Sequence, residues 1–527
     1  MRKLSPTVDR ATLAVGFLVL YLGWLSSRYN LDGIVYAFNL GKAVAGDFSL
    51  LWHPHHLLYG PFTYLFYRAI APAGFGYLLS MQLLNALFGA GCLFLFHRTA
   101  MAFLPSRFAA GIATAGLGGS YIFWFYSIEP EVYVPHTFFT LLALGLLLGV
   151  RKERSTGQTP GDSLLRAAAA GPLIALIGAT HVSGLALAPG IMLAQWWPQD
   201  AARPRFDRAG GRRLLAAALT AAAALAVLYA IGASMDPDTR RAGVTQWFLG
   251  RTLLQTGDVT SGRHWSLPPE SLILLANGFR RSLLARASFG EAALVALALL
   301  LVIYLVSLRR LLAERPRQHG LFLAFYLPAF AFFSVWEPVN PEMKVVLLPA
   351  VWLAAGTGAS VATRWRGPRL AVFLAVVILL LGLNGSQAIV PGSNPANNHN
   401  LIRSWFIRDH TEDNAVVYIS GKGDFNDGKI YILFFAGREK VVADWAMQGP
   451  DPVAELAASL AGHRGRPVYV TRDLADPGSE TFRQLAASNR VDPGRLTALF
   501  AGRLQPVGGR PDGEPGSGPF LFRYLPP

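Results

Sequence analysis

The chain has 527 residues, of which 52% are hydrophobic and 15% are charged. This composition excludes an ordinary soluble protein, because repeated uncharged stretches of about 17–22 residues are long enough to cross ~30 Å of hydrocarbon as helices. The net charge of +15 is explained by arginine-rich loops between spans, as the positive-inside rule predicts, so we expect no nucleic-acid partner. The sequence therefore predicts an α-helical polytopic membrane protein.

Apolar segments follow one another through most of the chain. We expect about eleven spans, near residues 11–27, 75–97, 107–126, 133–150, 167–182, 184–198, 214–234, 289–308, 320–336, 344–361 and 369–388. The first is expected to be retained, because it lacks the small-residue cleavage site of a signal peptide. The basic loops are expected in the cytoplasm, namely 151–154, 203–213, 309–317 and 364–369.

Counting spans between the basic loops places the N-terminus in the cytoplasm and residues 28–74 outside, as a first external loop. Its aromatic stretch 56–72 is then expected to lie on the outer leaflet without crossing it. The long loop 235–288 is also expected outside, and its segment 268–286 predicts an interfacial amphipathic helix.

The composition changes after residue 389. Residues 391–400 have the composition of a linker. Beyond it, apolar runs of strand type alternate with helical patterns; the runs lie at 415–420, 429–435, 466–471 and 520–525, and the helical patterns at 451–461 and 480–488. This alternation predicts a small extracytoplasmic α/β domain, 391–527, after a membrane domain, 1–390. We expect the small domain to serve recognition or support, because it shows no phosphate-binding glycine loop and no metal-ligand spacing.

Asp32 follows the first span directly. A carboxylate in a half-buried setting at a membrane surface could act as a general base on an acceptor hydroxyl. The alternative is a solvated loop aspartate, or a cap on a helix that starts near Gly33.

Two further acidic residues, Glu129 and Glu131, share a short external turn with several aromatic residues. They could position an acceptor or bind a metal, or they could simply be solvated. A second short external turn carries Glu337, Glu342 and Lys344. There the lysine could pair with a lipid phosphate or extend its ammonium group to water.

His53, His55 and His56 lie in one H-P-H-H segment of the first external loop. They could contact a phosphate or sugar, serve structure at the interface, or hold Zn²⁺ or Mn²⁺. Four ligands at a known metal spacing are missing, so no metal site and no cofactor are predicted, and a divalent ion stays an alternative.

Together these residues resemble the GT-C superfamily of integral-membrane glycosyltransferases, in its protein O-mannosyltransferase and lipid A aminoarabinose-transferase branch. The resemblance rests on Asp32 after the first span, on His53-Pro54 opening an aromatic segment, and on the acidic turn from Glu129 to Tyr133. It covers residues 10–150 well and 320–390 loosely.

The resemblance implies an inverting transfer of a sugar from a polyprenyl-phosphate carrier to a lipid, glycan or protein acceptor on the outer face. Asp32 would be the catalytic base, and Glu131 or Glu129 the acidic residue of the second loop. Arg28, the three histidines or Lys344 would stabilise charge on the departing phosphate. Membrane lipids are the remaining partners, and the bacterial inner membrane is the expected location.

Two other classes of function stay open. A transporter or flippase for lipid-linked envelope precursors is disfavoured, because the spans are nearly free of charge and show no internal repeat. A non-enzymatic membrane scaffold, whose domain after residue 389 binds a partner, is the other. The single cysteine, Cys92, lies in an apolar segment, so no disulfide is expected.

Overall fold

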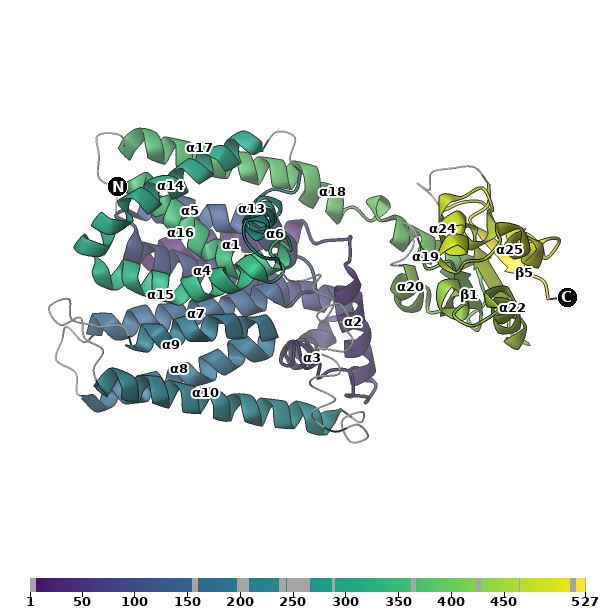
Figure 1. The fold of residues 1–527 in the computed structure, drawn as a ribbon, viewed down its shortest axis with the longest axis horizontal. Helices are drawn as coiled ribbons and strands as arrows, with labels where there is room; N and C mark the ends of the chain where they lie inside the picture. The colour runs from purple at the N-terminus through teal and green to yellow at the C-terminus, as the bar shows by residue number, and fades with distance from the viewer. Residues whose placement is uncertain are drawn as a thin grey trace. The chain divides into compact units, whose positions relative to one another are not determined.

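The computed structural model describes residues 6–153, 160–196, 208–236, 243, 266–286, 290–361, 366–422, 428–463, 465–511 and 518–526 (Figure 1). Parts of the predicted basic loops (154, 203–207, 364–365) and of the loop 235–288 lie outside these residues. Contacts between Cα atoms divide the chain into two compact units. The first comprises Met1–Ser26 and Asn39–Pro391, and the second Ser27–Phe38 and Gly392–Pro527.

The elements of regular secondary structure in the described residues of the first unit are all helices. Its helices, with α2 shared between the units and α18 at the junction, are α1 (Pro6–Gly23), α2 (Leu31–Val44), α3 (Tyr59–Ile70), η1 (Ala71–Ala73), α4 (Tyr77–Phe103), α5 (Arg107–Gly119), α6 (Tyr121–Ser127), α7 (Tyr133–Glu153), α8 (Pro160–Thr180), η3 (Val182–Leu187), α9 (Ala188–Trp196), α10 (Arg208–Met235), α13 (Glu270–Leu283), α14 (Glu291–Glu314), α15 (Pro316–Val335), η5 (Glu342–Leu347), α16 (Leu348–Ser360), α17 (Arg366–Asn384), η6 (Gly385–Ile389) and α18 (Val390–Ser393).

Within the described residues, six helices are long and apolar enough to cross a membrane, or seven if the bent pair α5–α6 is one span. Three shorter apolar helices occupy further predicted spans: Tyr133–Leu148, Ala167–Thr180 and Val182–Leu193. These helices confirm the prediction of a polytopic helical membrane protein, but not the number of eleven spans. The long helices pack in neighbouring pairs, with α8 along α10, α4 against α1 and α7, and α14 against α16 (Figure 1).

The third predicted span is broken at Ser120, where α5 and α6 meet at an angle of 68°. A glycine pair followed by serine is a common place for a sharp bend, which leaves helix carbonyls without partners in their own helix. Here the Tyr21 hydroxyl donates to the Gly118 carbonyl at 3.1 Å, and the Asn384 amide donates to the Gly119 carbonyl at 2.9 Å. Buried polar side chains from two other helices therefore stabilise the bend.

The prediction that residues 309–317 form a loop is wrong, because the segment is almost entirely helical. Helix α14 continues to Glu314 and α15 begins at Pro316, so only Arg315 separates them. Arg310 pairs with Glu314 one turn later at 2.5 Å, which extends the helix, and proline is well suited to the first position of the next one.

Short helices occupy the predicted external segments. Helix α3 has 12 residues and is about 18 Å long at 1.5 Å per residue, too short to cross the hydrocarbon. The amphipathic helix predicted at 268–286 is α13: it exposes Leu272 and Ile273 and buries Gly278 and Ser282.

The second unit contains a five-stranded mixed sheet with strand order β2-β1-β3-β5-β4. Strands β2, β1 and β3 are parallel, and β5 runs antiparallel between β3 and β4. Its elements are η7 (Pro395–Asn397), α19 (His399–His410), β1 (Val416–Ile419), α20 (Gly428–Tyr431), η9 (Ile432–Ala436), β2 (Glu439–Val442), α21 (Ala443–Ala446), α22 (Pro452–Gly462), β3 (Val468–Thr471), α23 (Arg472–Ala475), α24 (Glu480–Ser488), α25 (Pro493–Phe500), β4 (Leu504–Val507) and β5 (Leu521–Tyr524). The predicted α/β class is confirmed.

Three of the four predicted strands are present, and the strand predicted at 429–435 is wrong. Residues 429–435 form α20 and the π-helix η9, although their composition is typical of a strand. Tyr431 and Phe435 pack on Leu401, with Ile34 in the same cluster, so tertiary packing overrides the β propensity.

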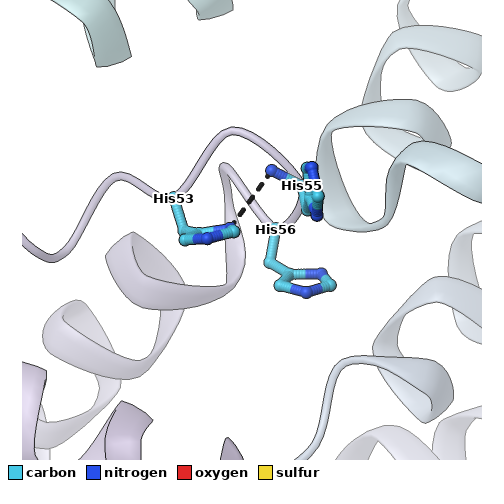
Figure 2. A group of neighbouring side chains, drawn as sticks. All are labelled: His53, His55 and His56. Atoms are coloured by element: carbon cyan, nitrogen blue, oxygen red, sulfur yellow. Dashed lines mark hydrogen bonds between the residues drawn. The ribbon is translucent and has the colours of Figure 1, made fainter. Parts of the chain in front are cut away.

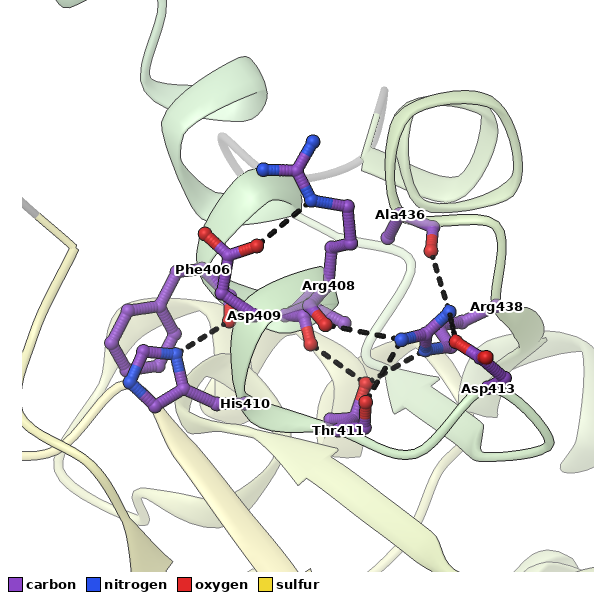
Figure 3. Close-up of polar contacts among 9 residues, drawn as sticks. Phe406, Arg408, Asp409, His410, Thr411, Asp413, Ala436 and Arg438 are labelled. Carbon is purple, nitrogen blue, oxygen red and sulfur yellow. Dashed lines mark hydrogen bonds and ion pairs between the residues drawn. The ribbon is translucent and has the colours of Figure 1, made fainter.

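Arg438 organises the end of α19 in this unit (Figure 3). Its guanidinium donates to the carbonyls of Arg408, Thr411 and Ala436 at 2.8–3.0 Å and to the Thr411 hydroxyl at 2.9 Å. Asp413 pairs with it at 3.0 Å from a fully exposed position and therefore adds little. A buried arginine thus satisfies carbonyls at a helix C-terminus, where a cation is favourable.

Candidate functional site

The acidic turn between α6 and α7 is buried. Glu129 and Glu131 are 0% and 2% exposed. The alternative of a solvated turn is therefore wrong. A carboxylate is seldom buried without compensating polar groups, so the residues around this turn define a polar site inside the first unit.

Two amides on α4 hold the turn in place. Gln82 donates to the carbonyls of Ser26 and Ile128 at 2.7 and 3.0 Å. Asn85 donates to three carbonyls, of Tyr126, Glu129 and Glu131, at 3.1, 2.7 and 2.6 Å. The two amides lie on one helix face because they are three residues apart. The sequence analysis missed both, although two amides at this spacing in an apolar segment were a readable signal.

Tyr59, the first residue of α3, completes this network. Its hydroxyl donates to the Asn85 side-chain carbonyl at 3.2 Å. Burial, and then the nearby charges of Glu131 and Glu129, raise the pKa of Tyr59 well above its ordinary value. The tyrosine is therefore a neutral donor, and the start of α3 adjoins the acidic turn.

Glu342 joins the turn 337–344 to the acidic turn 127–133. Its carboxylate accepts a hydrogen bond from the Tyr126 hydroxyl at 2.5 Å and another from the Tyr133 hydroxyl at 2.8 Å. The two tyrosine rings lie 5.0 Å apart between their centroids. The structure thus brings together two predicted clusters that are separated by more than two hundred residues.

Lys344 does not reach solvent, so the alternative of a lysine extending to water is wrong. Its ammonium donates to the Glu337 carbonyl at 3.1 Å and lies 5.5 Å from the Phe333 ring centroid. Glu337 has a left-handed backbone, with φ of 47°, and the Asn340 amide donates to its carboxylate at 2.5 Å. Left-handed non-glycine residues are often found where surrounding structure enforces them at functional sites.

The histidine loop lies between α2 and α3 (Figure 2). One ligand nitrogen from each of His53, His55 and His56 lies within 4.8 Å of the others. The His53 Nδ1 atom accepts a hydrogen bond from the His55 backbone N–H at 3.3 Å. Burial lowers the pKa of His55, and burial together with the neighbouring His181 lowers the pKa of His56 well below its usual range. Both imidazoles are therefore neutral at neutral pH.

The histidine loop also leads towards the acidic turn. The His56 ring lies 4.9 Å from His181, which lies 5.2 Å from Tyr133, the donor to Glu342. The His136 ring also stacks on His181, with 5.8 Å between centroids. Histidines, tyrosines and acidic residues from five elements therefore form one continuous polar layer.

Asp32 and Arg28 belong to the second unit, and both are exposed. Helix α2 starts at Leu31, two residues before the expected start. Its N-cap is Asn30, whose side chain accepts from the Gly33 N–H at 2.6 Å. The capping role proposed as an alternative for Asp32 therefore falls to Asn30. The meeting of Asp32 with the acidic turn in one cavity stays a prediction.

The segment that carries Asp32 is held by the second unit. The Asn398 amide donates to the Ser27 carbonyl at 2.6 Å, and the Tyr431 hydroxyl donates to the Tyr29 carbonyl at 2.5 Å. Ile34 packs into the same unit, against Leu401 and Tyr431. Residues far apart in the sequence thus fix the position of this segment.

The fold is similar to that of solved membrane-bound ArnT and oligosaccharyltransferase structures, so the resemblance seen in the sequence is confirmed for the fold. ArnT from Cupriavidus metallidurans, bound to undecaprenyl phosphate, matches with a TM-score of 0.61 over 97% of both chains, at 12% identity. The Archaeoglobus fulgidus oligosaccharyltransferase in its apo form matches with a TM-score of 0.57 over 96% of this chain and 74% of that chain, at 15% identity.

The A. fulgidus oligosaccharyltransferase AglB in complex with an inhibitory peptide and a dolichol-phosphate also matches, with a TM-score of 0.54 over 93% of this chain and 71% of that chain, at 12% identity. No model of a known protein family matches the sequence, and no curated protein does. The similarity thus establishes the fold.

The carboxylate of Glu342 is expected to stabilise this layer measurably. In Glu342→Gln the amide can accept from one tyrosine hydroxyl only, and its NH₂ group faces the other donor. We expect a loss of about 1.5–3 kcal/mol in the free energy of unfolding, the range for hydrogen bonds to a charged group. Unfolding of the purified protein in detergent, with a double-mutant cycle against Tyr133→Phe, measures it.

Glu314→Gln is the matched control, because Glu314 lies on the exposed side of α14 in a surface ion pair. Its loss should cost about 0.5 kcal/mol or less. Equal stabilities of Glu342→Gln and the control would contradict the role given to Glu342.

Proposed function

We propose that the protein is a membrane glycosyltransferase. It transfers a sugar from a polyprenyl-phosphate carrier to a lipid, glycan or protein acceptor on the extracytoplasmic face. The observation that carries the proposal is the match in fold to ArnT over 97% of both chains. The buried acidic turn, with its neighbouring histidines and tyrosines, provides a polar site of the kind that such a transfer requires.

In the proposed reaction, Asp32 accepts the proton of the acceptor hydroxyl as its oxygen attacks the anomeric carbon. The bond to the carrier phosphate breaks on the opposite face, which inverts the configuration. Polyprenyl phosphate is already a good leaving group, so no strong acid is needed. Preorganised donors such as Arg28 and Lys344 would stabilise the developing charge, and Glu131 or Glu129 would orient the acceptor.

The hydrocarbon tail of the carrier requires an apolar channel beside the spans. A cavity of about 440 Å³ lies between the external helix α13 and the helices α14, α15 and α16. Among the described residues that line it, Arg280 alone is charged, and aromatic and aliphatic side chains form most of its wall. We propose that this cavity receives part of the tail.

We further propose eleven spans, with the N-terminus in the cytoplasm, residues 28–74 and the domain 391–527 outside, and the bacterial inner membrane as the location. The shorter apolar helices and α1 would supply the spans beyond the six or seven long ones. Charged termini and protein neighbours allow such short helices to cross, with local thinning of the bilayer.

Cysteine labelling tests this topology. Ala73→Cys is preferable to the adjacent Gly74, whose φ of 80° disfavours a side chain. An impermeant maleimide should label Ala73→Cys in intact cells and label Glu314→Cys only after permeabilisation. The native Cys92 is buried and should give little background. Labelling of Ala73→Cys only after permeabilisation would refute the eleven-span arrangement.

Transfer of a radiolabelled sugar tests the function itself. Membranes that contain the protein are incubated with a panel of polyprenyl-phosphate sugars, and label is followed into lipid, glycan and protein fractions. We expect transfer with at least one donor and loss of transfer in Asp32→Asn. Directional movement of an intact lipid-linked sugar across vesicles, without sugar transfer, would favour the transporter instead.

A further inference from the structure

His53, His55 and His56 form the only group of three histidine, cysteine or acidic side chains in the described part of the chain whose ligand atoms lie close enough to share a metal ion. The nitrogens lie within 4.8 Å of one another (Figure 2). In a tetrahedral zinc site with Zn–N distances of 2.0–2.1 Å, ligand nitrogens are about 3.4 Å apart. Modest side-chain rotations would close the difference.

Three hydrogen bonds from other parts of the first unit already hold the backbone of this segment. The Val182 N–H donates to the His55 carbonyl at 3.0 Å, and the Leu58 N–H donates to the Ala179 carbonyl at 3.0 Å. From α10, the Tyr229 hydroxyl donates to the Pro54 carbonyl at 2.9 Å. Binding an ion would therefore order side chains only, which keeps its entropic cost small.

Close packing adds to this rigidity. A Cβ atom on Gly60 would lie 2.1 Å from the Leu51 carbonyl oxygen, so the start of α3 and the loop approach each other at a distance that only glycine allows. Leu57 and Leu58 pack on Ala179 and Ala233 beneath the loop. The histidines thus project from a scaffold and not from a free loop.

The donor set determines the ion. Three imidazoles, without thiolate or carboxylate in the group, suit Zn²⁺ better than the oxygen-preferring Mg²⁺ or Ca²⁺. Three protein ligands leave a fourth position for water or an anion. In the zinc-free protein the Nδ1 atom of His53 accepts the His55 N–H, so the proton of the neutral ring is on Nε2. Zinc binding through Nε2 would move this proton to Nδ1 and break that hydrogen bond, so it is part of the side-chain rearrangement that the ion requires.

We propose that His53, His55 and His56 bind one Zn²⁺ ion with an open fourth coordination position. Of the three roles that the sequence left open for these residues, namely contact with a phosphate or sugar, structure, or metal binding, the proposal takes the third. It does not depend on the glycosyltransferase activity, and its test reads out metal binding alone.

The test uses full-length protein in detergent, purified without a polyhistidine tag and stripped with a chelator. Zn²⁺ is then titrated in competition with a chromophoric chelator. We expect one Zn²⁺ per chain. Loss of a second-shell partner alone costs about 10–100-fold in metal affinity, so His53→Ala, His55→Ala and His56→Ala should each lower the affinity at least ~100-fold.

His399→Ala is the matched control, because His399 is exposed in the second unit. It should keep the stoichiometry and affinity of the unaltered protein. Thermal unfolding of the zinc-free variants shows whether each alanine variant is folded.

A second variant tests whether residue 55 is a metal ligand, even if an alanine variant fails to fold. His55→Cys loaded with Co²⁺ should show the thiolate-to-cobalt charge-transfer band, which requires that residue 55 be a ligand. Binding well below one ion per chain, affinities unchanged by all three substitutions, or a Co²⁺ spectrum without the thiolate band would overturn the proposal.

Discussion

Asp32→Asn is expected to lower turnover by ~10²–10⁴, the usual contribution of general-base catalysis. Asparagine keeps the shape of the side chain and removes the proton acceptor. Binding of the polyprenyl-phosphate donor should change little, so the loss should appear in kcat and not in the apparent donor KM. Initial rates of labelled-sugar transfer over a range of donor concentrations separate the two.

Asp47→Asn is the control for this substitution. Asp47 is also exposed and lies in the segment 28–74, but its carboxylate accepts hydrogen bonds from the Ser49 N–H and hydroxyl at 3.1 and 2.6 Å. This control should retain full turnover. Undiminished turnover in Asp32→Asn would end the assignment of Asp32 as the base, even if the protein proves to be a glycosyltransferase.

The sequence predicted what local composition controls. Apolar segments of sufficient length gave the membrane class, the position of α13 followed from its amphipathic pattern, and alternating patterns gave the α/β class of the second unit. The loop expected at 309–317 and the strand expected at 429–435 are both helical. In both places helix continuation or tertiary packing outweighed the charge or the β propensity of the segment.

The sequence singled out several acidic residues and histidines of the candidate site, but neither their arrangement nor the two amides of α4. The two acidic turns and the histidine loop were each found, because ionisable groups are conspicuous among apolar segments. The pairing of Glu342 with Tyr126 and Tyr133 spans more than two hundred residues, and no local pattern encodes it. The burial of Glu129 and Glu131 likewise depends on amides supplied by another helix.

Loss of the Asn85 amide on α4 is expected to have the second large effect. Asn85→Leu keeps the approximate volume of the side chain and removes every hydrogen bond that Asn85 makes. Three carbonyls and the Tyr59 hydroxyl then lose a buried partner. Unpaired buried groups cost about 1–3 kcal/mol each, although hydrogen bonds in membrane proteins average less, so we expect a total loss of about 2–4 kcal/mol in unfolding free energy.

Turnover should fall along with stability, because the carbonyls released are those of the turn that carries Glu129 and Glu131. Asn85→Gln, which keeps an amide, should recover part of both losses. Thr99→Val is the matched control on the same helix: the Thr99 hydroxyl bonds only to the Leu95 carbonyl one turn earlier, which belongs to the helix ladder anyway. Its change should stay within about 1 kcal/mol. If Asn85→Leu unfolds like this control and transfers sugar at the normal rate, the amide network neither holds the acidic turn nor supports catalysis.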